Sequence, residues 1–217
     1  MLYVIMCGGN YSYFEKPKAL TVVRGETLLD RTIRLLQEQG IKPDDIKITG
    51  SDERLSGHGA QVLHHDNDFK VTDIGGGRVS IQGYWLNAFI KTDEPICYLF
   101  GDVFFTEEAI KKIVDNGYRG NTLFGTIIKD LKAWNEPLAY KVRKPKEFFE
   151  GIEAVKELHR QGKCNRHPIV WELYRYLNGI PINKHFMLIE TYVHIENGGM
   201  DVDKLDEAEI IEKYFNK

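Results

Sequence analysis

The chain opens with the order of segments that builds a parallel sheet. Residues 2–7, LYVIMC, form a short continuous apolar run, which is typical of a strand buried on both faces. In residues 27–40 the apolar side chains recur at helical spacing, and Gly40 follows as a stop signal. Residues 44–50 predict a second strand. Strand, helix and strand in this order favour parallel pairing, because the helix carries the chain back across the sheet.

The rest of the chain continues this alternation. The apolar run ending in Gly101-Asp102 predicts a buried strand, and Thr106 is the expected N-cap of the helix that follows. Residues 79–91 are expected to start extended and to become a helix. We further expect strands at 61–65, 122–129 and 138–142, an extended segment at 184–196, and helices at 106–117, 145–162, 168–179 and 203–217. The pattern predicts an α/β fold with a mostly parallel first half.

Composition and charge exclude several classes of protein. The 217 residues suit one domain, and 29 basic against 32 acidic residues give a net charge of −3, which is no footprint for nucleic acid. No apolar run approaches the roughly 20 residues of a membrane span, and the opening run lacks the features of a signal peptide. Cys7, Cys97 and Cys164 are odd in number and widely spaced, so they indicate neither a disulfide framework nor a zinc site. We expect a cytoplasmic protein, with Cys7 and Cys97 buried.

A glycine pair and two lysines follow the first strand. Gly8 and Gly9 lie where open α/β sheets bind their ligands, and their exposed N–H groups can cradle phosphate oxygens or edge a base. Lys16 and Lys18 bring positive charge to the same loop, and Pro17 stiffens the turn. The dinucleotide fingerprint G-x-G-x-x-G and the phosphate loop G-x-x-x-x-G-K-[ST] are both absent. The alternative is a plain glycine turn with solvated lysines.

Beyond this loop the sequence resembles a known superfamily. An apolar strand, a glycine-rich turn, a loop ending in Pro-Lys and a helix of the form G-x-x-L-hydrophobic-x-R resemble the sugar-phosphate nucleotidyltransferases, including their molybdenum-cofactor guanylyltransferase-like branch. The residues that carry the likeness are Cys7-Gly8-Gly9, Pro17-Lys18, Gly25, Leu28 and Asp30-Arg31. The resemblance implies a single-domain, three-layer Rossmann-like fold with a mostly parallel mixed sheet.

The same resemblance implies how this loop would act. Cys7, Gly8 and Gly9 would hold the nucleotide by their backbone, and Lys18 would contact phosphate. One departure is notable, because the family usually has an arginine midway through the loop, where this chain reads NYSY at residues 10–13. Lys16 is the residue that could supply the missing charge.

Aspartates mark a predicted magnesium site. Asp102 ends the most convincing buried strand, and the resemblance identifies the apolar run followed by Gly-Asp as the family's metal motif. Nucleotidyl transfer needs such a carboxylate, because Mg²⁺ bridges phosphate oxygens and offsets the developing charge. The alternative is a turn or N-cap aspartate, but Thr106 is the better cap.

The family takes its second metal ligand from a D-x-D segment before the last helix. Asp201 and Asp203 in MDVDKLDEAEII stand in the matching place, with Asp203 slightly ahead, and Glu196 competes with them. The alternative for Asp201 and Asp203 is a helix N-terminus decorated with acids, which the helix dipole favours.

The middle of the chain offers weaker candidates. Gln82 and Gly83 occupy the position where the family reads its base, so we take them as candidate base contacts. The glycines at 75–77 form either a mobile loop near the nucleotide or a flexible turn. His64 and His65 make a poor shared metal site, because adjacent residues of a strand point to opposite faces.

The second half would bind the acceptor. In the wider superfamily this half covers the acceptor, and residues 134–153 resemble the guanylyltransferase-like branch. Candidate contacts to an acceptor phosphate are Glu136, Lys141, Arg143 and Lys144, and candidate walls for its organic part are Trp134, Trp171 and Tyr174. Core packing or surface exposure is the alternative for each of them.

The expected function is Mg²⁺-dependent nucleotidyl transfer. Residues 1–217 would form one nucleotidyltransferase domain, with a nucleotide-binding half at about 1–115 and an acceptor-binding half with a C-terminal helix at about 116–217. The expected partners are an NTP, with CTP or UTP favoured, and a phosphorylated sugar, polyol or similar small molecule; nucleic acid and membrane are not expected. The product would feed surface polysaccharides. The alternatives are a glycosyltransferase that consumes a nucleotide sugar and a non-catalytic nucleotide-binding protein.

Overall fold

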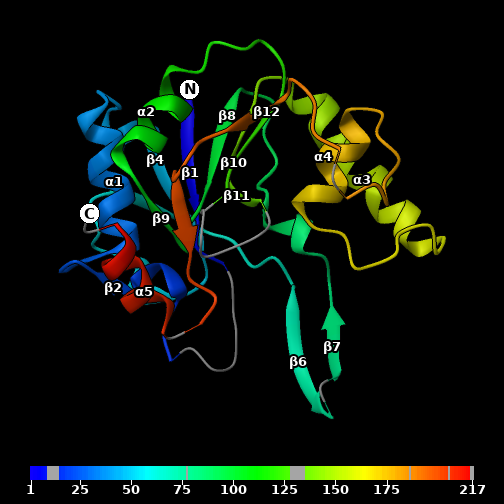
Figure 1. The fold of residues 1–217 in the computed structure, drawn as a ribbon, viewed down its shortest axis with the longest axis horizontal. Helices are drawn as coiled ribbons and strands as arrows, with labels where there is room; N and C mark the ends of the chain where they lie inside the picture. Colours follow the sequence, from blue (N-terminus) through cyan, green and yellow to red (C-terminus); the bar gives the residue numbers. More distant parts are fainter. Residues whose placement is uncertain (9–14, 77, 128–134, 186, 205, 216–217) are drawn as a thin grey trace.

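A computed structural model describes residues 1–8, 15–76, 78–127, 135–185, 187–204 and 206–215 of the chain (Figure 1). Its centre is a seven-stranded sheet in the order β12-β10-β11-β8-β1-β4-β5. These strands are β1 (Leu2–Met6), β4 (Ile46–Gly50), β5 (Gln61–His64), β8 (Ile96–Phe100), β10 (Thr122–Thr126), β11 (Glu136–Val142) and β12 (Tyr192–His194).

The sheet is mixed but mostly parallel. β1 pairs in parallel with both β4 and β8, β4 with β5, and β10 with β12, whereas β11 runs antiparallel to β8 and β10. Helices α1 (Leu28–Glu38) and α2 (Glu107–Asp115) lie on one side of the sheet, and α3 (Pro145–Arg160) and α4 (Val170–Leu177) on the other (Figure 1). The predicted fold class, an α/β sandwich of Rossmann-like type, is confirmed.

The first two long helices begin where the sequence indicated, whereas α5 (Glu207–Tyr214) begins at Glu207 and not at residue 203. Thr27 caps α1 by accepting a hydrogen bond from the Asp30 N–H at 3.0 Å, and the predicted cap Thr106 accepts one from the Ala109 N–H at 3.3 Å. Gly40 follows α1 with a φ of +81°, a conformation that glycine takes without strain.

Three pairs of short strands were not predicted, although the extended start expected for residues 79–91 is confirmed as the strand Arg78–Gln82. They are β2 (Val22–Val23) with β3 (Glu26–Thr27), β6 (Lys70–Gly75) with β7 (Arg78–Gln82), and β9 (Val103–Phe105) with β13 (Gly199–Asp201). The predicted helix within residues 79–91 is wrong: β7 is followed by a single 3₁₀ turn, η4 (Trp85–Ala88). The extended segment predicted for 184–196 forms a strand only at β12.

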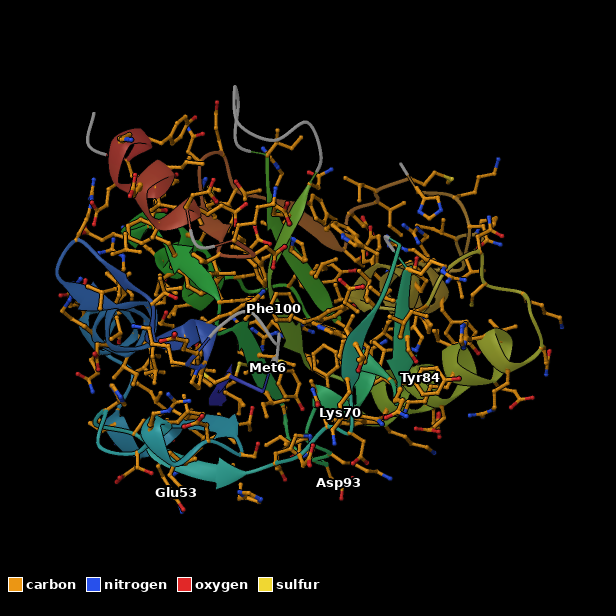
Figure 2. The ribbon with its side chains drawn as sticks, turned by 90° about the horizontal axis from the view of Figure 1, so that it is seen from below. Met6, Glu53, Lys70, Tyr84, Asp93 and Phe100 are labelled. Atoms are coloured by element: carbon orange, nitrogen blue, oxygen red, sulfur yellow. The ribbon has the colours of Figure 1, made fainter. Side chains whose placement is uncertain are left out.

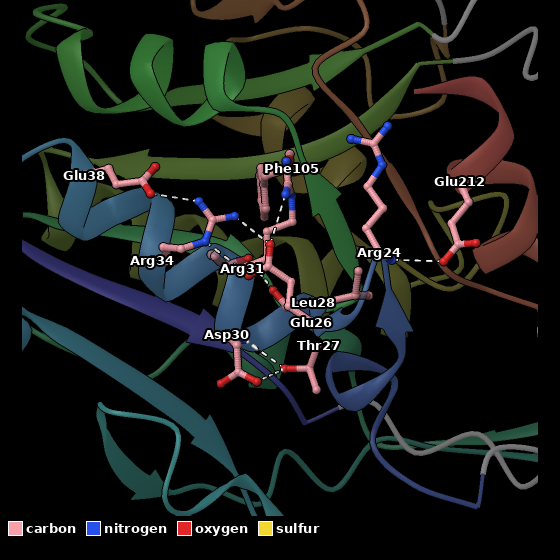
Figure 3. Close-up of polar contacts among 11 residues, drawn as sticks. Arg24, Glu26, Thr27, Leu28, Asp30, Arg31, Arg34, Glu38, Phe105 and Glu212 are labelled. Carbon is pink, nitrogen blue, oxygen red and sulfur yellow. Dashed lines mark hydrogen bonds and ion pairs between the residues drawn. The ribbon is translucent and has the colours of Figure 1, made fainter. Parts of the chain in front are cut away.

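Polar contacts at the start of α1 fasten the outer elements to it (Figure 3). Arg31 donates from Nε to the Phe105 carbonyl at 2.8 Å, and its guanidinium lies over the Phe104 ring. Glu26 pairs with Arg31 at 3.1 Å and with Arg34 at 2.6 Å. Arg31, one of the residues that carry the family likeness, therefore holds β9 against α1.

Two hydrophobic clusters make up the core. The larger one surrounds the central sheet and includes Cys7 and Cys97, both buried as predicted. The smaller one joins the last helix, α5 (Glu207–Tyr214), to the first third of the chain and contains Val23, Leu28, Phe104, Met200, Val202 and Ile211. No helix in the described part of the chain is both long enough and apolar enough to cross a membrane.

Candidate functional site

The site begins where β1 and β8 end side by side. Met6 is in register with Phe100, and the two are neighbours in Figure 2. Gly101 donates its N–H to the Met6 carbonyl at 3.0 Å. A Cβ on Gly101 would lie 2.6 Å from that carbonyl oxygen and 2.8 Å from Cys7 Sγ, so this close turn requires glycine. The turn places Asp102 beside the end of β1.

This edge is also the point where the strand order reverses. From β1 the sheet continues through β4 and β5 on one side and through β8 on the other. In open α/β sheets, ligands bind in the crevice beyond the carboxyl ends of the strands at such a switch point. The loop after β1 and the Asp102 turn both lie there.

The C-terminal acidic segment runs alongside Asp102. In the β9–β13 pair Asp201 is opposite Val103, and the Val202 N–H donates to the Asp102 carbonyl at 2.8 Å. Glu207 then accepts hydrogen bonds from the backbone N–H groups of Asp203 at 2.5 Å and Lys204 at 2.9 Å. These contacts fix Asp203 next to Asp102, although the two residues are far apart in sequence.

Lys18 joins the two carboxylates. It starts a 3₁₀ turn, η1 (Lys18–Leu20), and is only 4% exposed. Its Nζ lies 2.5 Å from Asp203 Oδ1 and 3.3 Å from Asp102 Oδ2. The predicted catalytic lysine and two of the three predicted metal-binding aspartates therefore meet at one point.

The environment shifts the pKa of both Asp102 and Cys7. Burial raises the pKa of Asp102 above its ordinary value, the Lys18 ammonium opposes this shift, and the negative charge of Asp203 adds to it. Burial, helped by Asp102, also raises the pKa of the Cys7 thiol, so this thiol stays protonated at neutral pH and is no nucleophile.

The acid pair fits the predicted Mg²⁺. Mg²⁺ prefers oxygen ligands and is commonly held by one or two carboxylates, with substrate phosphates and water completing its coordination. Asp102 and Asp203 already converge on a single cation, the Lys18 ammonium. In the described ranges there is no cluster of three or more His, Cys, Asp or Glu side chains able to hold a metal. Asp201 lies on β13, two residues before Asp203, and Glu196 lies between β12 and β13.

The glycine loop is only partly described. Gly9 and the NYSY segment lie outside the described residues. At Gly8 the backbone does not have positive φ, and among the described residues an added Cβ would meet Asn67 Nδ2 alone, at an ordinary 3.7 Å. The described part of the chain therefore does not itself require glycine at position 8. Lys16 is exposed, in contrast to the buried Lys18.

The middle candidates have visible structural roles. Gln82 ends β7 opposite Lys70, and Gly83 has a φ of +69° and no room for a Cβ, which would lie 2.3 Å from the Asp68 carbonyl oxygen. His167 donates from Nε2 to the Gly83 carbonyl at 3.0 Å, at the root of the β6–β7 hairpin. Of the 75–77 glycines, Gly75 and Gly76 lie at the hairpin's tip with positive φ, and residue 77 lies outside the described residues.

His64 is the last residue of β5, and His65 follows it. His65 donates from Nε2 to the Asn87 carbonyl at 2.7 Å, which ties the end of β5 to η4. This contact gives His65 a structural role.

Several acceptor candidates are structural. Lys141 is 1% exposed, and its Nζ donates to the carbonyls of Ile113 at 2.6 Å, Val114 at 3.0 Å and Asn116 at 3.2 Å. Burial lowers its pKa. Because these carbonyls at the end of α2 engage the ammonium, the suggested contact of Lys141 with an acceptor phosphate is wrong. Arg143 donates to the same Asn116 carbonyl at 2.9 Å.

The remaining acceptor candidates are divided. Tyr174 is fully buried and its hydroxyl accepts from the Ile189 N–H at 2.9 Å, so it belongs to the core. Glu136 is buried on β11, Trp171 is half-buried against Tyr192, and Lys144 is exposed and paired with Glu147 at 3.2 Å. Trp134 lies outside the described residues.

Two residues at the site were not predicted. Asn67 approaches Gly8, and nothing in its surroundings in the sequence signals this. Glu207 positions Asp203 by accepting hydrogen bonds from the backbone N–H groups of Asp203 and Lys204, and nothing in the sequence around Glu207 signals this role.

A large groove lies elsewhere, between the segment after β5 and α3. It encloses about 840 Å³ and mixes acids and lysines over an apolar floor that includes Leu86 and Phe89. The cavity beside Lys18 holds only about 20 Å³. We nevertheless locate the candidate site at Lys18, because charged groups converge there that can act on a phosphate. The volume of the groove alone does not provide such groups.

The chain matches known proteins by family model and by fold. A family model described as a MobA-like NTP transferase domain matches residues 3–168. No protein of curated function matches by sequence at a significant level.

Solved structures of nucleotide-transferring enzymes share the fold. The CTP:phosphocholine cytidylyltransferase of Streptococcus pneumoniae is 12% identical with a TM-score of 0.54, covering 99% of both chains. The nucleoside-diphosphate-sugar pyrophosphorylase of Vibrio cholerae is 12% identical with a TM-score of 0.57, covering 98% of this chain and 100% of its own. The inositol-1-phosphate CTP transferase of T. maritima is 11% identical with a TM-score of 0.56, covering 99% of this chain and 96% of its own.

Proposed function

Because the chain belongs to the MobA-like NTP transferase family, we propose that it transfers a nucleoside monophosphate from an NTP to a small phosphorylated acceptor. The observation that carries the proposal is the meeting of Lys18, Asp102 and Asp203 at the carboxyl ends of β1 and β8. CTP or UTP is the favoured donor, and a phosphorylated sugar, polyol or similar molecule the acceptor. The reaction would take place in the cytoplasm and supply activated precursors for surface polysaccharides.

The proposed chemistry is a direct displacement. A phosphate oxygen of the acceptor attacks the α-phosphorus of the NTP in line, a new P–O bond forms, and the bond to the bridging oxygen breaks so that pyrophosphate leaves. The protonated Cys7 offers no covalent route, so the chain contributes positioning and charge stabilisation. Asp102 and Asp203 would hold Mg²⁺, which when bound offsets negative charge on the phosphates. Lys18 would contact the triphosphate, and the Gly8 backbone would lie against the nucleotide.

The test is release of pyrophosphate. The protein is mixed with each of the four NTPs, Mg²⁺ and a panel of phosphorylated sugars, polyols and amino alcohols, and pyrophosphate is measured together with the nucleotide-linked product. We expect release only when a matching NTP and acceptor are both present. Release of a nucleoside diphosphate from a nucleotide sugar would instead support a glycosyltransferase, and tight NTP binding without either product would support a non-catalytic binder.

Asp102→Asn is the control variant. Because the pKa of Asp102 is raised in the folded protein, folding favours its neutral form, and any stability linked to this group decreases as pH rises above the ordinary carboxyl pKa. The amide of Asn keeps the shape of the side chain and an oxygen that can accept from Lys18, so we expect the variant to fold at pH 7. We expect a folded variant with no pyrophosphate release, and wild-type rates in that variant would contradict the metal role of Asp102.

A further inference from the structure

Lys18 stands where a cation shared by the acid pair would stand. Its ammonium lies 2.5 Å from one carboxylate oxygen and 3.3 Å from another, and its side chain is almost completely buried. Asp203 and Asp102, by contrast, keep 51% and 34% of their side chains exposed. The lysine therefore approaches the pair from the protein side and leaves the carboxylates facing outward.

The position of Lys18 conflicts with binding of a free metal. Mg²⁺ contacts oxygen ligands at about 2.0–2.1 Å, so a metal held by both acids and an ammonium held by both acids would crowd the same oxygens. A magnesium ion and an ammonium held next to the same carboxylate oxygens repel each other strongly in a partly buried site. The small cavity beside Lys18, lined also by Cys7, Gly101 and Asp102, holds only about 20 Å³.

We propose that Lys18 is an internal counterion that keeps free divalent metal off Asp102 and Asp203 until nucleotide arrives. In the nucleotide-free protein its ammonium neutralises the pair. When a triphosphate binds, its oxygens offer Lys18 a stronger partner, and the four-carbon stem lets the ammonium turn toward them. The pair is then open to the metal that accompanies the triphosphate. This inference rests on the proposed function and adds an order to it: metal enters with nucleotide and not before.

The test uses Mn²⁺ alone, as a paramagnetic and calorimetric probe for Mg²⁺, without nucleotide. Lys18→Met replaces the ammonium with an apolar side chain of similar length. The matched control, Lys112→Met, removes an equal charge from the exposed face of α2, where Lys112 pairs with Glu108. We expect Mn²⁺ to bind Lys18→Met at least about tenfold more tightly than the wild type or Lys112→Met, since tenfold corresponds to only roughly 1.4 kcal/mol of removed repulsion. In a parallel titration, Lys18→Met should lose affinity for NTP.

The wild type is decisive even if Lys18→Met does not fold. The inference is overturned if the nucleotide-free wild type binds Mn²⁺ tightly and the Asp203→Asn variant does not. Weak binding of Mn²⁺ to the nucleotide-free wild type supports the inference. Equal Mn²⁺ affinity in folded Lys18→Met and wild type also overturns it. If the variant is only destabilised, its melting temperature should rise with Mn²⁺ concentration while that of the wild type does not. None of these readouts uses turnover, so a chain that releases no pyrophosphate can still pass or fail them, and the two proposals fail separately.

Discussion

Gly8 is a residue that the described fold does not constrain. Its backbone needs no positive φ, and among the described residues the space for a Cβ is bounded by Asn67 alone, at 3.7 Å. Gly101, on the neighbouring strand end, is the opposite case, because a Cβ there would lie 2.6 Å from the Met6 carbonyl oxygen. The two glycines therefore form a matched pair for experiment.

We expect Gly8→Val to keep the melting temperature of the ligand-free protein within a few degrees while weakening NTP binding by roughly tenfold or more, because one lost close contact to an anion is worth about 1.5–3 kcal/mol. Gly101→Val, the control, should lower the melting temperature sharply through the clash between β1 and β8. Calorimetry with NTP and thermal unfolding without it give the two readouts. If Gly8→Val destabilises the fold but binds NTP normally, the glycine serves only the turn.

The sequence predicted the role of a residue where its place relative to a strand or loop suggests that role. Asp102 at the end of a buried run and Lys18 after the glycine loop could be identified in this way. The partners of Lys18 could not, because they lie 84 and 185 residues away and only the folded sheet brings them together. Lys141 shows the limit most clearly, since a lysine in a strand looks like a surface or ligand-binding charge until the carbonyls at the end of α2 are seen around it.

At the scale of elements, the length of a strand or helix decided whether the sequence could predict it. The longer central strands and the helices carry their apolar pattern over enough residues to be recognised. β9 and β13, at three residues each, do not complete a pattern, yet their pairing is what brings the D-V-D segment to Asp102. The β6–β7 hairpin projects from the body with nearly all of its residues exposed, and the sequence predicted an extended start only for the β7 side (Figure 1).

The β13–α5 segment carries the next prediction. Asp203 contacts Lys18 directly, whereas Asp201 sits earlier on β13, opposite Val103. We expect Asp203→Asn to raise the Mg²⁺ concentration needed for half-maximal pyrophosphate release at least about tenfold, which is the size of effect seen when a contact at a metal site is lost. We expect Asp201→Asn to raise this concentration less. Steady-state rates at a fixed NTP concentration across a Mg²⁺ series measure both. A larger effect from Asp201→Asn would transfer the ligand role to that residue.

At the scale of the whole molecule, the two hydrophobic clusters are joined through α1. Leu28 belongs to the smaller cluster and its neighbour Leu29 to the larger one. The smaller cluster also holds α5 against the first third of the chain, and the Arg24 N–H adds a hydrogen bond to Glu212 at 3.0 Å. The position of the segment that carries Asp203 therefore depends on packing that lies outside the central sheet.

Ile211→Ala tests this dependence. Ile211 is fully buried in the smaller cluster, so its truncation should cost about 2–4 kcal/mol. For a chain of this size that corresponds to a fall of roughly 4–16 °C in melting temperature. We expect one cooperative transition, with weaker NTP-linked metal binding, and little change in the control Glu209→Ala on the exposed side of α5. A separate early transition in calorimetry would show that α5 unfolds independently of the sheet.

The 185-residue separation between Lys18 and Asp203 has a consequence during synthesis. At about 5–20 residues per second, a ribosome needs roughly 10–40 s to pass from the codon of one residue to that of the other. For that interval the emerging polypeptide carries Lys18, and later Asp102, without the second carboxylate. A nascent chain stalled before Asp203 should therefore fail to retain metal–nucleotide, so ligand capture on the ribosome would report the moment at which the carboxyl-terminal segment docks.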